Sequence, residues 1–230
     1  MVKAFYQDKW VTIYHGDCRE ILPQLDVKVD LVLTDPPYGI DYQSARRTAP
    51  FRKNKIQGDD EFPLWLFDLI KPTSAYLLFC RWDVLPILPT PKSFIVWNKG
   101  NHSMGDLEHE YGRQWEAIAF YPQAQHEFLF RPVDIIEAMR ISPDKLIHPN
   151  EKPEAVVSPL IAANKGDLIL DPFLGSGTTC YCAKKLNRHS IGIEIEEKYC
   201  EIAAKRCMQE SFEFDNIDAN NIASKQQPML

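Results

Sequence analysis

Seven short apolar runs, each bounded by turn-forming residues, alternate with stretches of helical periodicity along this chain of 230 residues. Because helices that connect neighbouring strands cover both faces of a sheet, the alternation predicts an α/β fold with a mostly parallel sheet. The expected strands are residues 11–16, 28–35, 74–80, 93–99, 115–121, 167–173 and 189–195. The expected helices are residues 18–25, 62–70, 152–163, 177–186 and 196–207.

Length and composition are those of one globular domain. With 45% hydrophobic and 25% charged residues, the chain can bury one sizeable core, and we expect that domain to span residues 1–210. Residues 40–60 and 122–147 do not fit the alternation and are expected to be functional excursions from the sheet. The polar residues 211–230 are expected to form a mobile tail.

Several classes of protein are disfavoured. No apolar run reaches the roughly 18 residues of a membrane span, and the amino terminus lacks the apolar core of a signal peptide, so we expect a cytoplasmic protein without a membrane partner. The six cysteines form no CxxC pair and have no histidine pair at zinc spacing, which predicts reduced cysteines and no metal site. The net charge of −6 argues against a broadly basic protein that wraps nucleic acid, but it leaves room for a local basic groove.

The run LVLTDPPYGIDY at residues 31–42 ends in a carboxylate, two prolines and an aromatic ring. Proline has no backbone N–H and a fixed φ, so the strand should end at Asp35 or Pro36. A polar, rigid and aromatic group thus follows a buried strand directly. The simplest alternative is that Asp35 caps a helix and the prolines only terminate the strand.

A second motif, DLILDPFLGSGTTCYCAKKL, has the form of a cofactor-binding loop. An apolar strand leads to Asp171, Gly175 and Gly177 let the chain turn tightly, and a helix begins with Thr178 and Thr179. The next strand ends at Glu194, nineteen positions after Gly175, where a carboxylate can accept hydrogen bonds from the ribose hydroxyls of an adenosine cofactor. The loop lacks the third glycine of a dinucleotide site, and the chain contains no GxxxxGK[ST] motif, so nicotinamide and nucleoside triphosphate ligands are disfavoured.

Four motifs in a fixed order give the chain a family resemblance. They are TDPPYG at 34–39, HPNEKP at 148–153, DPFLGSGTT at 171–179 and GIEIEEKY at 192–199. In this order the chain resembles the S-adenosylmethionine-dependent DNA amino-methyltransferases of the β class, in which the catalytic motif precedes the cofactor motif. The resemblance implies a Rossmann-like sheet of seven strands, one of them antiparallel, with the strands that end at Asp35 and Asp171 side by side. It also implies methylation of adenine N6, because DPPY accompanies adenine and SPPY is more usual for cytosine N4.

The resemblance gives a catalytic role to the residues of the TDPPYG motif. The exocyclic amine of adenine shares its lone pair with the ring, so acceptors on its N–H bonds are needed to direct that pair at the methyl group. Asp35 and the carbonyl of Pro36 would accept these bonds, and the Pro36–Pro37 unit would hold the carbonyl in place. Tyr38 would stack on the flipped base. A sulfonium is a good leaving group, so this chemistry requires no metal.

The resemblance also assigns residues to the cofactor. They are Asp17, Cys18, Asp35, His148, Asn150, Lys152, Asp171, Phe173, Gly175, Ser176, Gly177, Thr178, Thr179 and Glu194. Lys152 would meet the cofactor carboxylate and Phe173 would cover the cofactor, whereas Phe173 as a core residue and Lys152 as a solvated helix start are the simpler alternatives. Asp17 is equally suited to cap a helix. The family usually has Thr and Gln where this chain has Asn150 and Glu151.

Double-stranded DNA is the expected partner. Five cationic residues without an intervening acid follow the catalytic motif and could hold phosphates: Arg46, Arg47, Arg52, Lys53 and Lys55. A solvated charged face is the alternative. With the segment 122–147, this run is expected to contact DNA. Enzymes that methylate cytosine N4 or an RNA adenine, and a non-catalytic subunit, remain alternative functions, and the sequence leaves open whether the chain forms a homodimer.

Overall fold

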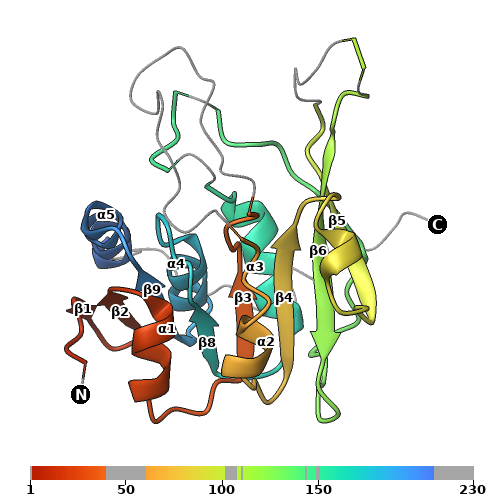
Figure 1. The fold of residues 1–230 in the computed structure, drawn as a ribbon. Coiled ribbons are helices and arrows are strands. Elements are labelled where there is room, and N and C mark those ends of the chain that lie inside the picture. Colours follow the sequence, from red (N-terminus) through yellow and green to blue (C-terminus); the bar gives the residue numbers. More distant parts are fainter. Residues whose placement is uncertain are drawn as a thin grey trace.

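The structure, a computed structural model, describes residues 2–39, 61–101, 108–109, 111–142, 144–148 and 151–209. These residues form one sheet in the order β1-β2-β9-β8-β3-β4-β6-β5-β7, with helices on both faces (Figure 1). The strands are β1 Tyr6–Gln7, β2 Val11–His15, β3 Leu31–Thr34, β4 Ala75–Cys80, β5 Ser93–Asn98, β6 Trp115–Pro122, β7 Ile135–Glu137, β8 Leu168–Asp171 and β9 His189–Glu194. The α/β class predicted from the sequence is confirmed.

All seven predicted strands are present, and two short strands extend the sheet at its two edges. β6 pairs antiparallel with β4 and with β5, so it is the one reversed strand among the seven. The additional strand β1 pairs antiparallel with β2, and β7 pairs parallel with β5. The described sheet therefore has nine strands rather than seven, and part of the segment 122–147 belongs to it. β1 and β7 were missed because two and three residues are too few to show an alternating pattern.

The predicted helices are also present, and prolines shorten some of them. They are α1 Cys18–Ile21, α2 Leu66–Leu69, α3 Glu154–Ala163, α4 Thr178–Lys185 and α5 Glu197–Met208, with 3-10 turns at η1 Leu22–Gln24 and η2 Leu85–Ile87. Pro63 and Pro153 disfavour helical conformation in the residue before each of them, which delays the start of α2 and α3. Pro23 lies within the 3-10 turn that replaces the end of the predicted first helix.

Apolar side chains on the two faces of the sheet form separate cores. On one face, strand residues such as Leu33 and Phe79 pack with Val156 and Ile161 of α3 and with α4. On the other face, Val32 and Tyr76 pack with side chains of α1 and α2. All six cysteines are buried and unpaired, as the sequence predicts for reduced cysteines. None of the helices in the described part of the chain is long and apolar enough to cross a membrane.

The sheet order places the two sequence motifs next to each other. β3 and β8 are parallel neighbours, with Leu31 opposite Ile169 and Val32 opposite Leu170. β8 pairs in turn with β9, and the three strands are parallel. Asp171 and Glu194 end their strands and Asp35 directly follows β3, so all three residues lie at the carboxyl ends of adjacent strands. This confirms the predicted juxtaposition of the two motifs. Open α/β sheets bind ligands at this edge.

Candidate active site

The segment after β3 is held in a fixed turn. Pro36 is buried, and Gly39 has a left-handed φ of 71°. A Cβ at Gly39 would lie 2.7 Å from the backbone nitrogen of Phe62, so both the conformation and the space require glycine. The Tyr38 hydroxyl donates to Oδ1 of Asp35 at 2.5 Å. The catalytic motif predicted from the sequence is therefore a rigid turn with its carboxylate already engaged.

Asp35 belongs to a network of buried charges that crosses four elements. The Lys152 ammonium, just before α3, contacts Oδ2 of Asp35 and lies 3.1 Å from Oε1 of Glu116 on β6. The Lys99 ammonium, just after β5, lies 2.6 Å from Oε2 of Glu116. The exposed fraction of the side chain is 11% for Lys152, 11% for Glu116 and 19% for Asp35, so the two carboxylates and two ammonium groups depend on one another for compensation.

Burial and neighbouring charges shift the pKa values in this network. Burial raises the pKa of Asp35, against the attraction of Lys152 and with the help of the Glu116 charge. Burial also disfavours the charge on Glu116, but Lys152 and Lys99 outweigh it and hold the pKa of Glu116 at about 2. Burial opposes the charge on Lys152 as well, and the two carboxylates outweigh it and raise its pKa. Glu116 and Lys152 are therefore charged at neutral pH.

Glu116 and Lys99 are site residues that the sequence analysis missed. Glu116 interrupts the otherwise apolar run of β6, where a charged side chain next to the buried Ala117 is unusual. That interruption is the signal that could have identified Glu116. The pairing of Glu116 with Lys152 could not have been predicted from either local sequence, because only the tertiary fold brings the two residues together.

The second motif forms a loop between β8 and α4 that is organised by Asp171. Oδ1 of Asp171 accepts from the Thr34 hydroxyl at 2.7 Å and from the Phe173 backbone N–H at 3.1 Å. Burial raises the pKa of Asp171 to about 6, against hydrogen bonds from Thr179, Thr34 and the Phe173 backbone. Because Thr34 ends β3, this hydrogen bond links the turn after β3 to the glycine loop.

Glu194 closes the same loop from the end of β9. Its Oε2 accepts from the Gly175 backbone N–H at 2.8 Å, and its Oε1 accepts from the Glu196 backbone N–H at 2.8 Å. Burial raises the pKa of Glu194, although these two hydrogen bonds favour its ionised form. Each carboxylate oxygen has a second lone pair, so Glu194 can accept from a ligand while it holds the loop.

The glycines of this loop are needed where they stand. Gly175 has a φ of 54°, and a Cβ there would touch the His148 ring at about 3.5 Å. Gly177 has a φ of 83°, and a Cβ there would lie 2.7 Å from the Cβ of Ala203 on α5. Ser176, Thr178 and Thr179 are buried around them. The loop thus presents backbone to its surroundings and packs closely against α5, as a site for a nucleoside requires.

Other predicted cofactor residues surround this loop. The His148 ring packs edge-on against Tyr199 at 4.4 Å between centroids, and burial, with the nearby Lys152 and Lys198 charges, lowers the pKa of His148 to about 4. Phe173 is half-buried and lies 6.2 Å from the Trp65 ring. Asp17 caps α1 by accepting from the Arg19 backbone N–H at 2.8 Å, so the capping alternative is confirmed. Burial raises the pKa of Cys18 to about 12, so that thiol is neutral.

Some predicted residues cannot be placed. Asn150 and the five cationic residues between 46 and 55 lie outside the described residues, as does the predicted tail at residues 211–230. Among the described residues, no group of three or more His, Cys, Asp or Glu side chains is arranged to hold a metal ion.

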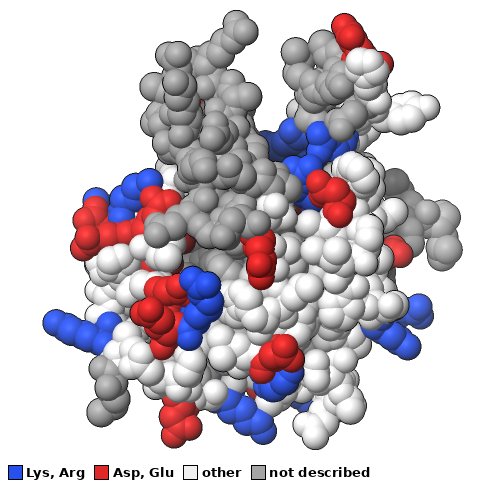
Figure 2. Space-filling model, in the orientation of Figure 1, with Lys and Arg blue, Asp and Glu red and all other residues white. Residues whose placement is uncertain are grey.

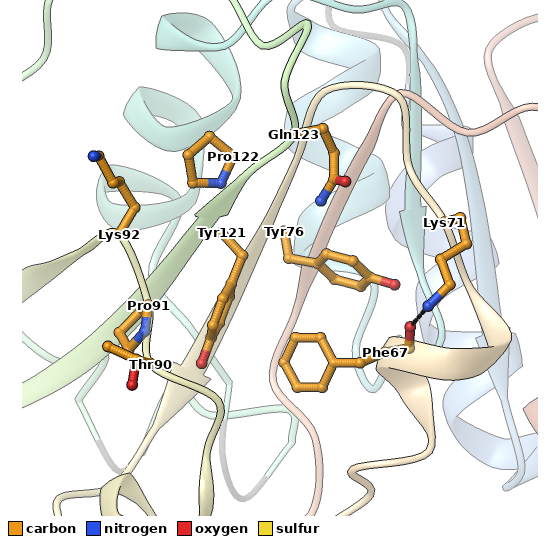
Figure 3. A pocket seen from close by; sticks show the side chains of 9 residues that line it. All are labelled: Phe67, Lys71, Tyr76, Thr90, Pro91, Lys92, Tyr121, Pro122 and Gln123. Carbon is orange, nitrogen blue, oxygen red and sulfur yellow. Dashed lines mark hydrogen bonds between the residues drawn. The ribbon is translucent and has the colours of Figure 1, made fainter.

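A cavity of about 490 Å³ lies at the other end of the sheet. Figure 3 shows its lining, in which Phe67, Tyr76 and Tyr121 form an aromatic wall between Lys71 and Lys92. Tyr76 is the second residue of β4 and pairs with Tyr121, whereas Cys80 at the opposite end of β4 pairs with Ala117, next to Glu116. The cavity is therefore separate from the Asp35 network.

Comparisons with known proteins agree with this geometry. The family model described as DNA methylase (N6_N4_Mtase) matches residues 131–205. The type II methyltransferase M.HpaI of Haemophilus parainfluenzae is 27% identical over 225 residues, covering 83% of this chain and 71% of the relative. This chain is similar to the N6/N4 DNA methyltransferases.

Two further proteins are similar to this chain over a comparable length. The DNA adenine methyltransferase YhdJ of Escherichia coli is 28% identical over 248 residues, covering 85% of this chain and 82% of the relative. The crystal structure of M1.HpyAVI, determined as a complex with SAM, superimposes with a TM-score of 0.67 and 25% identity, covering 86% of this chain and 99% of that chain. The residues that the family model matches include β8 and the glycine loop after it.

Proposed function

We propose that the protein is a DNA adenine N6-methyltransferase that uses S-adenosylmethionine. The observation that carries this proposal is the pairing of β3 with β8, which sets the acceptor Asp35 beside the glycine loop at one edge of the sheet. The amine and the methyl donor must meet within a few ångströms for transfer. Two adjacent parallel strands that end in these two motifs supply that proximity.

The cofactor fits the loop that Glu194 closes. Bound S-adenosylmethionine would supply an electrophilic methyl group on its sulfonium. Glu194 retains acceptor capacity for ribose hydroxyls, the loop carries left-handed glycines, and Phe173 stands half-buried beside it. Lys152 is assigned to the cofactor carboxylate by the resemblance, and its ammonium contacts Asp35 and Glu116.

Asp35 and the Pro36 carbonyl would act on the substrate amine. Accepting its two N–H bonds draws the nitrogen lone pair out of conjugation and towards the methyl carbon. The methyl group would pass to the nitrogen with the S–C electron pair left on sulfur, and the proton then released by the nitrogen would pass to Asp35 or to solvent. Tyr38 would stack on the flipped base, which offsets part of the cost of about a few kcal/mol for flipping it.

A second surface supports DNA as the substrate. Figure 2 shows Lys and Arg side chains gathered near the end of β5 and the start of β6, on a face where charges of both signs are otherwise interspersed. Arg140 donates here to the main-chain carbonyls of Asn101 and Arg113. Tyr111 and Trp115, which lie before and at the start of β6, are exposed. Cations with exposed aromatic rings suit phosphates and unstacked bases.

Adenine is preferred over cytosine because the motif is DPPY and YhdJ is named an adenine methyltransferase. The family model covers both N6 and N4 enzymes, so cytosine N4 is the second candidate. A non-catalytic subunit is disfavoured because Asp35, Tyr38 and the glycine loop occur together in one chain.

Purified protein incubated with S-adenosylmethionine labelled on its methyl group and with duplex DNA tests the proposal. After digestion to nucleosides, the label is expected in N6-methyldeoxyadenosine. Label in N4-methyldeoxycytidine would show the cytosine alternative, and label only in an RNA substrate would show the RNA alternative. DNA from expressing cells, sequenced by a method that detects modified bases, would give the target sequence.

Glu194→Gln is expected to weaken S-adenosylmethionine binding about 10- to 100-fold. Both carboxylate oxygens accept from backbone N–H groups, so an amide must set its own NH2 against one of them and lose a charge-assisted bond worth about 1.5–3 kcal/mol. Calorimetric titration measures the affinity. Glu197→Gln, an exposed carboxylate at the start of α5, is the matched control. Equal affinities for both variants and the parent would mean that Glu194 does not support the cofactor.

Neutralising Arg46, Arg47, Arg52, Lys53 and Lys55 together is expected to weaken binding to DNA of every sequence. Phosphate contacts position a duplex without reading it, and removing one cation from a phosphate should reduce the slope of log affinity against log salt by about 0.9. Binding measured at several salt concentrations on target and scrambled duplexes checks this. A variant that keeps its salt slope but loses its preference for the target would identify the run as a base reader.

A further inference from the structure

Asp35 has donors on both of its oxygens before any substrate arrives. The Tyr38 hydroxyl donates to Oδ1 at 2.5 Å, and the Lys152 ammonium donates to Oδ2. Both donors draw negative charge from the carboxylate, so they weaken Asp35 as an acceptor for an amine N–H. A site that uses Asp35 to activate an amine therefore needs another acceptor for these two donors.

Glu116 provides such an acceptor with a single atom. Its Oε1 lies 3.1 Å from the Tyr38 hydroxyl and 3.1 Å from the Lys152 ammonium, so both donors of Asp35 are within reach of the same oxygen. The other oxygen, Oε2, is held by Lys99 at 2.6 Å. β6 fixes the backbone of Glu116 opposite Trp97 of β5, and the Trp97 indole N–H is itself bonded to the Ala138 carbonyl at 2.7 Å. Glu116 is thus anchored from behind, with one oxygen facing the two donors.

We propose that Glu116 is a positioning residue that receives the Tyr38 and Lys152 donors when the substrate amine engages Asp35. This inference rests on the proposed methyl transfer and names a further residue for it. The exchange breaks no covalent bond, and each proton stays on its own oxygen or nitrogen. The network contains two carboxylates and two ammonium groups before and after the exchange, so no uncompensated charge is created in a buried site.

A purely structural role for Glu116 makes a different prediction. If Glu116 only neutralises Lys99 and Lys152, its loss should destabilise the fold, and the Tyr38 hydroxyl should matter equally with or without it. If Glu116 accepts the hydrogen bond of the Tyr38 hydroxyl, then loss of the Glu116 carboxylate leaves that hydroxyl bonded to Asp35 throughout the reaction. Removing the hydroxyl should then restore part of the rate.

The test is a cycle of Glu116→Gln and Tyr38→Phe, with kcat, the KM for S-adenosylmethionine and the KM for DNA measured for each variant. Glu116→Gln is expected to lower kcat about 10-fold or more and to change either KM by less than about 3-fold. In that background Tyr38→Phe, which keeps the ring, is expected to raise kcat at least about 3-fold, whereas it brings no gain in the parent protein. Glu127→Gln, in an exposed pair with Lys165, is the control carboxylate.

Glu116→Asp serves if the glutamine variant does not fold, because it keeps the charge and withdraws the carboxylate by about 1.5 Å from both donors. It should show the same loss of kcat and the same recovery with Tyr38→Phe. An active parent in which Tyr38→Phe has the same effect in both backgrounds overturns this inference alone. A parent that transfers no methyl group to any nucleic acid overturns the proposed function, and the inference with it.

Discussion

Asp35→Asn is expected to lower kcat for methyl transfer by at least about 10²–10³-fold while the protein stays folded. The substituted side chain keeps one acceptor oxygen but turns an NH2 group towards either Tyr38 or Lys152, so it cannot accept from the substrate amine as a carboxylate does. The fold should survive because Lys152 keeps the Glu116 carboxylate at 3.1 Å. Single-turnover measurements at saturating S-adenosylmethionine and DNA isolate the chemical step.

Asp167→Asn is the matched control for Asp35→Asn, since Asp167 is an exposed carboxylate whose partner is His189. It should leave kcat unchanged. Thermal unfolding of both variants shows whether the fold is kept. A folded Asp35→Asn protein with nearly normal kcat would rule out Asp35 as the acceptor and would leave the Pro36 carbonyl as the remaining candidate.

The fold could be predicted because its information is local. Each buried strand is a short apolar run that ends at a turn signal, and the chain alternates these runs with helices, so the parallel class follows from the sequence. The limits of the helices depend on prolines that act on their immediate neighbours, such as Pro63 and Pro153, and a reading of apolar periodicity alone extends the helices past them.

The site was only half predictable, for a physical reason. Asp35, Glu194 and the glycine loop carry local signatures, because a backbone that must turn sharply or approach a ligand needs particular residue types. Lys99 has no such signature, and Glu116 has only the weaker one of a charged residue within an apolar strand. Their ion pairs depend on the position of β6 between β4 and β5 and on the contact of Glu116 with Lys152, just before α3. Both are features of the tertiary structure.

The structure also changes what individual residues are expected to do. Glu194 was expected to meet ribose hydroxyls, and it also fixes the loop through the Gly175 backbone. Lys152 was expected to meet the cofactor carboxylate, and it also compensates two carboxylates of the protein itself. A substitution at either position is therefore expected to change protein structure as well as ligand binding, and stability must be measured beside activity.

Lys152→Met is expected to lower the free energy of unfolding by about 3–5 kcal/mol at pH 8, because removing one partner leaves buried charge without compensation. Methionine keeps most of the length and apolar surface of the lysine stem, so reduced packing contributes little. Without the ammonium, Asp35 faces Glu116 directly, and the pKa of Asp35, which burial already raises, rises further. Denaturant unfolding at pH 5 and pH 8 measures the effect, and Lys165→Met in the exposed pair with Glu127 is the control.

The sign of the pH dependence separates missing charge compensation from a general defect. A carboxyl group whose folded pKa is raised binds a proton more tightly in the folded state, so its contribution to stability is complete below the unfolded value of about 3.9 and is lost as pH rises through the folded pKa. The deficit of Lys152→Met relative to the parent should therefore be smaller at pH 5 than at pH 8. Adding Asp35→Asn removes the second carboxylate and leaves Glu116 with Lys99, so the double variant should regain much of the stability at pH 8. A deficit that is equal at both pH values and unchanged by Asp35→Asn would mean that Lys152 does not compensate Asp35.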